Sequence, residues 1–563
     1  MKNFNKSKSL FALEGVGNTP IKDFISKIQA DAMTEMEIKD LLCSILTVKN
    51  KTVGDLVCLM SKFKDSRIGG LTLPMYMMLY NKTLSFNLSS EQIMSILERS
   101  DLSIQDQNGL TLPMYLFQYN KEQNLGLSSE QIMSVLEKSD LSIKDNNGLI
   151  LPMYLFLYNK DQNLNFSPGQ IMLVLERSDF SIQDFSGWTL PNYLLSYNKD
   201  QKINFSQEQI MSVLERSDLS VKTDCGVLPM FLLRNNKSES LGLSSKQILS
   251  IIERSDLSAQ DQNGVILPMD LLTFNKDQRI NLSSKQIFSI IENSDLSIKN
   301  DYGWDLLFHV LNHNKNQKLF LLPSQIISMF EKSDLLSVDR SGFTHVNYLL
   351  CNNKKEGLNF SEDQIFSILK QSDLSVKTDE GITPLSLLVF NNKKENLNIS
   401  SDHVVSIFGQ SNSLIEDEEG GTPLLHLLSY NRSNGINLSS NQVMSIFDKV
   451  APYMDSLNGW LFLSGVLTYN KDQGLDLSSK QIRSIFKRIE PDVIDDRLVT
   501  LFFSTLEVQF NLSKDHLYEV LSLFNSSKKI KSIKNKEKID NLLLYFNIDK
   551  VEKTKLIKPS PKL

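Results

Sequence analysis

The chain has 563 residues, of which 41% are hydrophobic and 22% charged, and its formal net charge is −6. This composition is that of a folded, soluble protein, and no apolar run reaches the roughly 18 residues that a membrane-spanning helix needs. The mild excess of acidic residues argues against a nucleic-acid groove along the body of the chain, because binding to phosphates depends on clusters of Lys and Arg.

The N-terminal sequence shows no export signal. Residues 1–17 are basic, but their apolar stretch is too short and too interrupted for a signal peptide. The four cysteines, which are Cys43, Cys58, Cys225 and Cys351, are scattered without a C-x-x-C pair. Scattered cysteines are typical of a reducing compartment, so we expect a cytoplasmic protein.

Three helical patterns, at residues 20–30, 35–47 and 53–64, occupy the first part of the chain. They precede a series of repeats, and the end of a repeat array needs an atypical element with a polar outer side. We therefore expect residues 1–69 to form an N-terminal helical cap.

A block of about 39 residues recurs eleven times between residues 70 and 489, and residues 101–139 and 140–178 are two adjacent copies. Repetition at this period predicts a repeat solenoid, in which each repeat buries its apolar face on its neighbours. A solenoid offers a long surface rather than one closed catalytic pocket. The repetition thus favours a binding function.

Each repeat opens with a glycine that we expect to end a polar turn, because short polar residues such as Asp106 and Asn108 precede it. The eleven glycines are Gly70, Gly109, Gly148, Gly187, Gly226, Gly264, Gly303, Gly342, Gly381, Gly420 and Gly459. An apolar run with Pro near its start follows, as at Pro113. This run predicts a short first helix, since Pro is tolerated in a first helical turn.

An asparagine followed by Lys or Arg ends the first helix of every repeat. These residues are Asn81, Asn120, Asn159, Asn198, Asn236, Asn275, Asn314, Asn353, Asn392, Asn431 and Asn470. Asn is the usual non-Gly residue of the left-handed conformation that closes a helix, so we interpret it as a C-cap. The alternative is a ladder of amides that contacts an extended partner.

A capping box predicts where the second helix of each repeat begins. Ser89 and Gln92 have the spacing of an N-cap residue and the third helical residue, and the pattern recurs along the chain. The apolar residues that follow, such as Ile93 and Ile96, form one buried stripe. A Ser-Asp-Leu-Ser-Ile segment, too short for a helix, then leads to the next turn.

The order of helix, loop, helix and a turn ending in D-x-N-G resembles the ankyrin repeat. The sequences T-P-L-L-H at residues 422–426 and T-P-L at residues 383–385 are similar to the signature of that family. The resemblance covers residues 70–489, with a degenerate copy at residues 17–20. It departs in a longer loop between the helices and larger residues in the first helix.

This resemblance implies an all-α helical repeat solenoid with extended turns between repeats and a role in binding proteins. An α-solenoid of another kind is the alternative.

No set of residues predicts catalysis, a cofactor or a metal site. His309 and His313 have the spacing of metal ligands on a helix, but tyrosine holds both positions in other repeats, and no third ligand is near in sequence. We therefore interpret them as replacements for an aromatic ring. The acidic turn at residues 417–420 lacks the alternating oxygen ligands of a calcium loop.

Four aromatic residues directly follow a turn glycine, at a position that holds mostly Leu, Val or Ile in the other repeats. They are Trp188, Trp304, Phe343 and Trp460. The resemblance places this position on the partner-binding side, and aromatic residues dominate interface hot spots. A half-buried apolar seam between repeats is the alternative interpretation.

A shortened helix pair at residues 498–524 predicts a C-terminal cap over residues 490–527. Residues 528–563 form a basic tail of charge +7, against −13 for the preceding chain. Its first lysines are Lys528, Lys529, Lys531, Lys534, Lys536 and Lys538. Such a tail could bind a membrane or nucleic acid, or it could simply be solvated.

The sequence therefore predicts a monomeric, non-enzymatic scaffold that binds a protein partner through its concave surface and turn tips. The alternative is a structural tether whose basic tail holds it to a membrane or nucleic acid. Ankyrin-like proteins rich in Lys, Asn and Ile resemble effectors of host-associated bacteria. By analogy, this implies export to a host cell without a conventional signal peptide.

Overall fold

The computed structural model describes residues 21–27, 33–48, 51–64, 66–409, 413–489, 495–509, 514–528 and 530–555. The chain forms two compact units, Met1–Leu282 and Ser283–Leu563, which we call the N-terminal and C-terminal units. Their boundary falls inside the sixth repeat. The degenerate copy expected at residues 17–20 lies outside the described residues.

The N-terminal unit consists of short helices joined by turns and loops. Its elements are α2 (Ile21–Ser26), α3 (Glu35–Leu46), α4 (Val53–Lys62), β1 (Arg67–Ile68), β2 (Leu71–Thr72), α5 (Leu73–Leu79), α6 (Ser90–Leu97), α7 (Leu112–Tyr119), α8 (Ser129–Leu136), α9 (Leu151–Tyr158), α10 (Pro168–Glu176), α11 (Leu190–Tyr197), α12 (Gln207–Arg216), β3 (Lys222–Thr223), β4 (Gly226–Val227), α13 (Leu228–Asn235), α14 (Ser245–Ile252) and α15 (Leu267–Phe274).

The C-terminal unit continues the same pattern and ends in longer helices. Its elements are α16 (Ser284–Glu292), α17 (Leu306–His313), α18 (Pro323–Lys332), α19 (His345–Asn352), α20 (Glu362–Gln371), α21 (Pro384–Asn391), α22 (Ser401–Phe408), α23 (Pro423–Tyr430), α24 (Ser440–Val450), the 3-10 helix η3 (Ala451–Tyr453), α25 (Ser456–Tyr469), α26 (Ser479–Arg488), α27 (Asp496–Gln509), α28 (Lys514–Ser526) and α29 (Ile533–Lys555). Among the described helices, none is both long and apolar enough to cross a bilayer.

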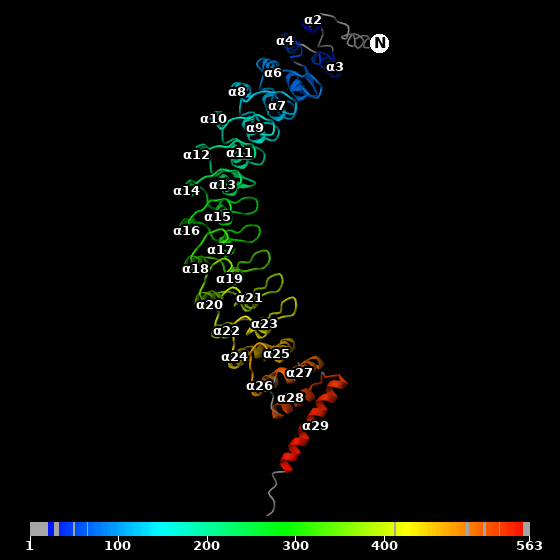
Figure 1. Ribbon diagram of the computed structural model, residues 1–563, viewed down its shortest axis with the longest axis vertical. Helices are drawn as coiled ribbons and strands as arrows, with labels where there is room; N and C mark the ends of the chain where they lie inside the picture. Colours follow the sequence, from blue (N-terminus) through cyan, green and yellow to red (C-terminus); the bar gives the residue numbers. More distant parts are fainter. Residues whose placement is uncertain are drawn as a thin grey trace, which may run out of the picture. The chain divides into compact units, whose positions relative to one another are not determined.

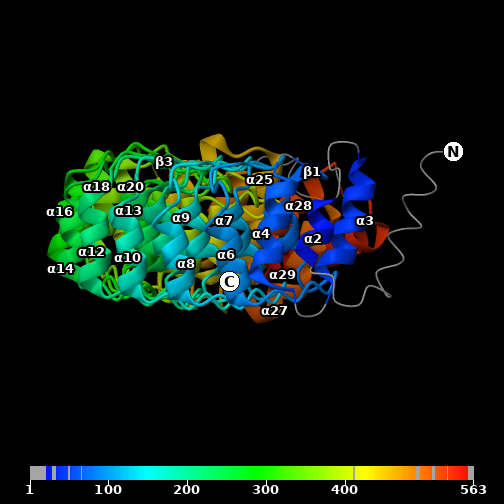
Figure 2. The same cartoon turned by 90° about the horizontal axis from the view of Figure 1, so that it is seen from above.

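Each unit is a helical repeat solenoid built from two rows of helices (Figure 1). The first helices of successive repeats pack on one another, from α5 to α15 in the N-terminal unit and from α17 to α25 in the C-terminal unit. The second helices form the other row, in which α8, α10 and α12 lie next to one another (Figure 2). The core lies between the rows, where Phe117 and Ile132 are fully buried.

The turns before the first helices are tight and partly β-hairpins. β1 pairs antiparallel with β2, and β3 with β4. The first ten turn glycines have positive φ, for example 76° at Gly109, which is the conformation that favours glycine. The eleventh prediction is wrong, because Gly459 lies inside α25, which begins at Ser456 after an Asp455 N-cap.

The predicted capping boxes are confirmed. In α6 the Gln92 backbone N–H donates to the Ser89 hydroxyl at 3.3 Å, and the Ser89 backbone N–H donates to the Gln92 side chain at 2.9 Å. Proline also occupies the first turn of several first helices, as at Pro113 of α7. Each cap contributes about 1 kcal/mol to helices that are too short to be stable alone.

The conformation predicted for the asparagine at the end of each first helix is wrong. Asn159 has φ −52° and ψ −48°, which is right-handed helical backbone. The left-handed residues lie four and six positions later, at Asn163 and Asn165 in this loop and at equivalent positions in every other loop. The asparagine is therefore conserved in the repeat for its side chain rather than for its backbone.

This side chain is buried and joins two repeats. The Asn159 Oδ1 accepts a hydrogen bond from the Phe166 backbone N–H (2.9 Å), and its Nδ2 donates to the Gln201 carbonyl of the next repeat (3.1 Å). The Gln201 side chain in turn accepts from the Lys160 backbone N–H at 3.1 Å. All eleven asparagines are at most 5% exposed, which leaves no free amide ladder for a partner.

In six of the ten turns an aspartate three residues before the glycine fixes the shape of the turn. The Asp106 Oδ1 accepts from the backbone N–H groups of Asn108 and Leu110, both at 2.8 Å, and its Oδ2 accepts from the Tyr115 hydroxyl at 2.8 Å. The same pairs are Tyr154–Asp145, Tyr193–Asp184 and Tyr348–Asp339, and His426 replaces the tyrosine at Asp417. The turn is thus anchored to the first helix of its own repeat.

In the fifth, sixth and ninth repeats other residues replace the aspartate or the tyrosine of this pair, and each replacement is matched at the partner position or by a nearby cation. Where Phe231 or Leu387 replaces the tyrosine, Thr223 or Thr378 replaces the aspartate, so no carboxylate is left without a donor. In the sixth repeat Asp270 takes the tyrosine position beside Asp261. The Arg234 side chain then pairs with both carboxylates, at 2.9 Å to Asp261 and 2.7 Å to Asp270.

This triad makes the stability of the N-terminal unit depend on pH. Burial raises the pKa of Asp270 to about 7, although the nearby Arg234 guanidinium opposes the shift. The ordinary unfolded value is about 3.9, so between about pH 4 and 7 the folded state binds the extra proton. Stability from this group is therefore lost as the pH rises through that window.

We expect an Asp270→Asn variant to lack this contribution. Urea unfolding of both proteins at intervals from pH 4 to 8 should show the wild type losing stability relative to the variant up to about pH 7. Parallel profiles across the window would contradict this assignment.

Candidate partner-binding surface

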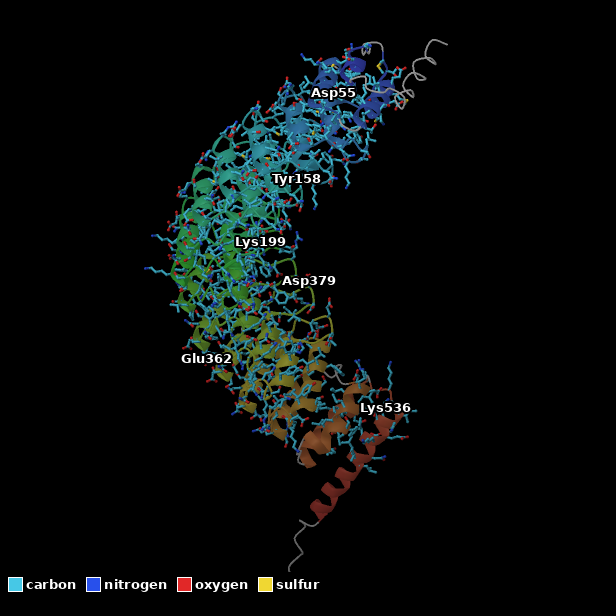
Figure 3. The ribbon with its side chains drawn as sticks, turned by 45° about the horizontal axis from the view of Figure 1, so that its top comes forward. Asp55, Tyr158, Lys199, Glu362, Asp379 and Lys536 are labelled. Carbon is cyan, nitrogen blue, oxygen red and sulfur yellow. The ribbon has the colours of Figure 1, made fainter. Side chains whose placement is uncertain are left out.

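The turns project from the row of first helices, and Figure 3 shows Asp379 at the end of one such turn. Backbone hydrogen bonds join neighbouring turns. The Asn146 N–H donates to the Asn108 carbonyl (2.9 Å) in the N-terminal unit, and the Arg340 N–H donates to the Tyr302 carbonyl (2.9 Å) in the C-terminal unit. Within each unit, bonded neighbours like these give the edge of turns a defined shape.

The first predicted anchor, Trp188, is half-buried between two repeats. Its ring lies 5.4 Å from the Tyr193 ring of its own repeat and 5.0 Å from the Phe231 ring of the next. This contact agrees with the apolar seam interpretation and leaves only part of the ring accessible. A role of Trp188 in partner binding stays a prediction.

Two of the predicted residues, Trp304 and Phe343, meet in one cluster of the C-terminal unit. The ring of Tyr348 lies 5.5 Å from that of Trp304 and 5.7 Å from that of Phe343. The Trp304 indole N–H and the Tyr348 hydroxyl both donate to Asp339, at 3.3 Å and 2.9 Å. We call Trp304, Phe343 and Tyr348 the aromatic cluster.

A cavity of about 240 Å³ opens beside this cluster. It is lined by Asn312, Asp339, Ser341, Phe343, Tyr348, Cys351, Asn352 and Lys355. Burial raises the pKa of the Cys351 thiol, which keeps this sulfur protonated and unreactive. Two of its lining residues are aromatic and most of the others are polar, so the cavity suits a partner side chain that has both apolar and polar atoms.

Trp460 is placed differently from the other three. It lies on α25 rather than after a turn, and its indole N–H donates to Asp495 at 3.2 Å. The Arg497 guanidinium lies 4.9 Å from the centre of its ring. These contacts join Trp460 to the C-terminal helices instead of to the edge of turns.

A row of half-buried tyrosines lies at the C-terminal ends of the first helices of the N-terminal unit. It consists of Tyr80, Tyr119, Tyr158 and Tyr197. Each ring packs against the buried tyrosine four residues earlier, for example Tyr158 against Tyr154 with centroids 5.8 Å apart. Burial raises the pKa of Tyr158, so its hydroxyl stays available as a donor. The sequence signal was a second tyrosine at a fixed place in the repeat.

The turns also carry two exposed aromatic rings that were not predicted from the sequence. Phe185 is 81% exposed in the N-terminal unit, and Tyr302 is 61% exposed in the C-terminal unit. The signal was an aromatic residue inside a turn that is otherwise polar. Exposed rings on a fixed edge are suited to contact with another protein.

The basic C-terminal segment includes a long helix. α29 packs on α28 and α27, with Ile530 and Ile539 buried. Lys531 and Ser532 donate backbone hydrogen bonds to Asp496, which fixes the start of this helix. Of the predicted lysines, Lys529 lies outside the described residues, and the others are exposed, as Figure 3 shows for Lys536. Binding of these lysines to a membrane or nucleic acid stays a prediction.

The two histidines with metal-ligand spacing lie beside the aromatic cluster. His309 is buried, and this burial lowers its pKa to about 3. Its ring lies 5.3 Å from the Trp304 ring and 6.0 Å from the His313 ring. Both histidines therefore pack as aromatic rings, in the positions that tyrosine holds in other repeats.

Among solved structures, the chain is similar to the ankyrin repeat domain of Bcl-3, described as a unique member of the IkappaB protein family. The match has 12% identity and a TM-score of 0.28, and it covers 46% of this chain and 99% of that one. No protein-family model matches the chain, and no curated protein matches it. The solenoid architecture accordingly rests on the contacts between the helices of this chain.

Proposed function

We propose that this chain is a non-enzymatic scaffold that binds a protein partner along its turns and first helices. The observation that carries the proposal is the aromatic cluster with its adjoining cavity of about 240 Å³. The cavity has two aromatic residues, Phe343 and Tyr348, in its lining, and aromatic side chains dominate interface hot spots. The proposed centre of the contact is therefore Trp304 and Phe343.

The turns and first helices of the N-terminal unit support the same proposal. The tyrosine row and the exposed Phe185 offer rigid rings that lose little conformational entropy on binding. A host protein as the partner is supported only by the analogy with Lys-, Asn- and Ile-rich proteins of host-associated bacteria. Identification of the partner therefore has to come from affinity capture followed by a quantitative binding assay.

The test is a Trp304→Leu/Phe343→Leu double variant. Leucine is found after the turn glycine in other repeats, as at Leu110, so the variant keeps an apolar seam. We expect the affinity for the captured partner, measured by calorimetry with purified proteins, to fall at least tenfold, because hot-spot residues each contribute 2 kcal/mol or more. The midpoint of thermal unfolding should stay within a few degrees.

Trp188→Leu is the matched control, since it removes the same ring from the other unit. If the double variant binds as tightly as the wild type, the aromatic cluster is not the centre of the contact. Equal losses in the control and the double variant would mean that the two units share the partner.

A further inference from the structure

The seventh repeat departs from its neighbours where its second helix begins. Ten of the eleven repeats have a serine N-cap at this point, but α18 has Leu322, which makes no side-chain cap and is 61% exposed. A leucine N-cap is among the least favourable, so this position gives up stability. It also places a large apolar side chain in solvent.

Two residues earlier, Phe320 has φ 49° and is 58% exposed. The ten equivalent residues in the other loops are Asn, Gly or Asp, which tolerate this left-handed backbone. A phenylalanine in this conformation is strained. The seventh repeat therefore breaks two local rules within three residues, and both exceptions expose an apolar group.

The segment after α18 reverses the pattern of the other repeats. In six other repeats it reads Ser, then Ile or Val, then Lys or Gln, and the serine hydroxyl donates to the preceding aspartate, as in Ser297 to Asp295. Here the residues are Leu336, Ser337 and Val338. Leu336 is 65% exposed, while Ser337 is buried with no hydrogen-bond partner for its hydroxyl among the described residues.

None of these exceptions improves the fold, and departures from local rules without a structural gain are expected at functional sites. A groove of about 230 Å³ lies between α18 and α20, and it is lined in part by Leu335, the neighbour of Leu336 in the chain. Its apolar walls are Ile327, Phe330, Leu335 and Ile368. Figure 3 places Glu362, the first residue of α20, on the opposite side of the C-terminal unit from the turn of Asp379.

Two carboxylates, Glu331 and Asp363, line this apolar groove, and Asp334 lies in the adjoining segment. Within the described residues no Lys or Arg forms an ion pair with these three groups. An acidic rim around an apolar groove is complementary to a segment that has a cation next to an apolar side chain.

We infer that the groove between α18 and α20 docks a segment of a partner protein with a large apolar anchor beside a Lys or Arg. This contact is separate from the edge of turns, so it goes beyond the function proposed above. Leu322, directly before α18, and Leu336, directly after the groove residue Leu335, are exposed apolar side chains close in sequence to this groove.

The test uses a restored variant, Phe320→Asn/Leu322→Ser/Leu336→Ser/Val338→Lys, which returns four positions to the residues of the other repeats. It is expected to unfold at the same temperature as the wild type or a higher one. A random peptide display library is selected on the full wild-type chain after depletion on the restored variant. Enriched peptides should share an apolar residue with Lys or Arg within about four positions, the spacing of one helical turn.

The affinity of an enriched peptide should fall at least tenfold in Glu331→Lys/Asp363→Lys and in the restored variant. It should be unchanged in Trp304→Leu/Phe343→Leu, which separates this contact from the proposed edge of turns. No enrichment, enrichment without a basic residue, or equal binding to the restored variant would overturn the inference. So would sedimentation that shows a wild-type dimer and a monomeric restored variant, because the occupant would then be a second copy.

Discussion

Replacing Arg234 with Leu is expected to lower the free energy of unfolding of the N-terminal unit by about 3 to 5 kcal/mol at pH 8, because removal of one partner leaves buried charges uncompensated. The Arg234 side chain donates to Asp261 at 2.9 Å and to the Cys225 carbonyl at 2.7 Å, and it pairs with Asp270 at 2.7 Å. The side chains of both aspartates are almost fully buried. The leucine itself fits, since Leu157 holds the equivalent position in the third repeat.

A second substitution tests whether charge, and not shape, causes the loss. Adding Asp270→Tyr to Arg234→Leu restores the pair seen in the third repeat, where the Tyr154 hydroxyl donates to Asp145 at 2.7 Å. We expect the double variant to recover to within about 1 kcal/mol of the wild type, because Asp261 regains a donor. Hydrogen exchange of residues 228–274 resolves this local stability. A double variant no more stable than Arg234→Leu alone would rule out the explanation.

The parts of the fold that the sequence predicted are those whose causes lie within a few residues. Ser89 and Gln92 form a capping box because both partners sit in one helical turn, and Gly109 ends its turn because of its own backbone. The role of Asn159 was missed because one partner, Gln201, lies 42 residues away. The position of Asn159 at the end of a helix suggested a local cap, whereas its side-chain hydrogen bond to Gln201 joins two repeats.

The candidate surface was predicted only in part for a related reason. The position after the turn glycine does bring Trp304 and Phe343 together, but through Tyr348, whose part in the cluster no local pattern predicted. Trp460 was assigned to this position by counting along the repeat. Its glycine has Ser456 three residues before it, and the Asp455 N-cap starts a helix there instead of a turn.

Strict repetition makes the exceptions informative. Caps, turn glycines, buried asparagines and Asp–Tyr pairs explain why most positions repeat, since each satisfies a buried polar group or ends a helix. Phe320 and Leu336 satisfy no such need and expose apolar surface. Positions that repeat therefore report on folding. Both proposed contacts lie in the seventh and eighth repeats, and the exceptions at Phe320, Leu322 and Leu336 belong to the seventh.

The buried asparagines also give the second large effect, because Asn159→Ala should cost about 2 to 6 kcal/mol of stability. The substitution leaves the Phe166 N–H and the Gln201 carbonyl without their partner, and each unpaired buried group costs about 1 to 3 kcal/mol. Asn108→Ala is the matched control, since Asn108 is exposed and should change stability by less than about 0.5 kcal/mol. Urea unfolding with hydrogen exchange at Phe166 measures both, and equal stability of the two variants would show that water or a shifted loop replaces the asparagine.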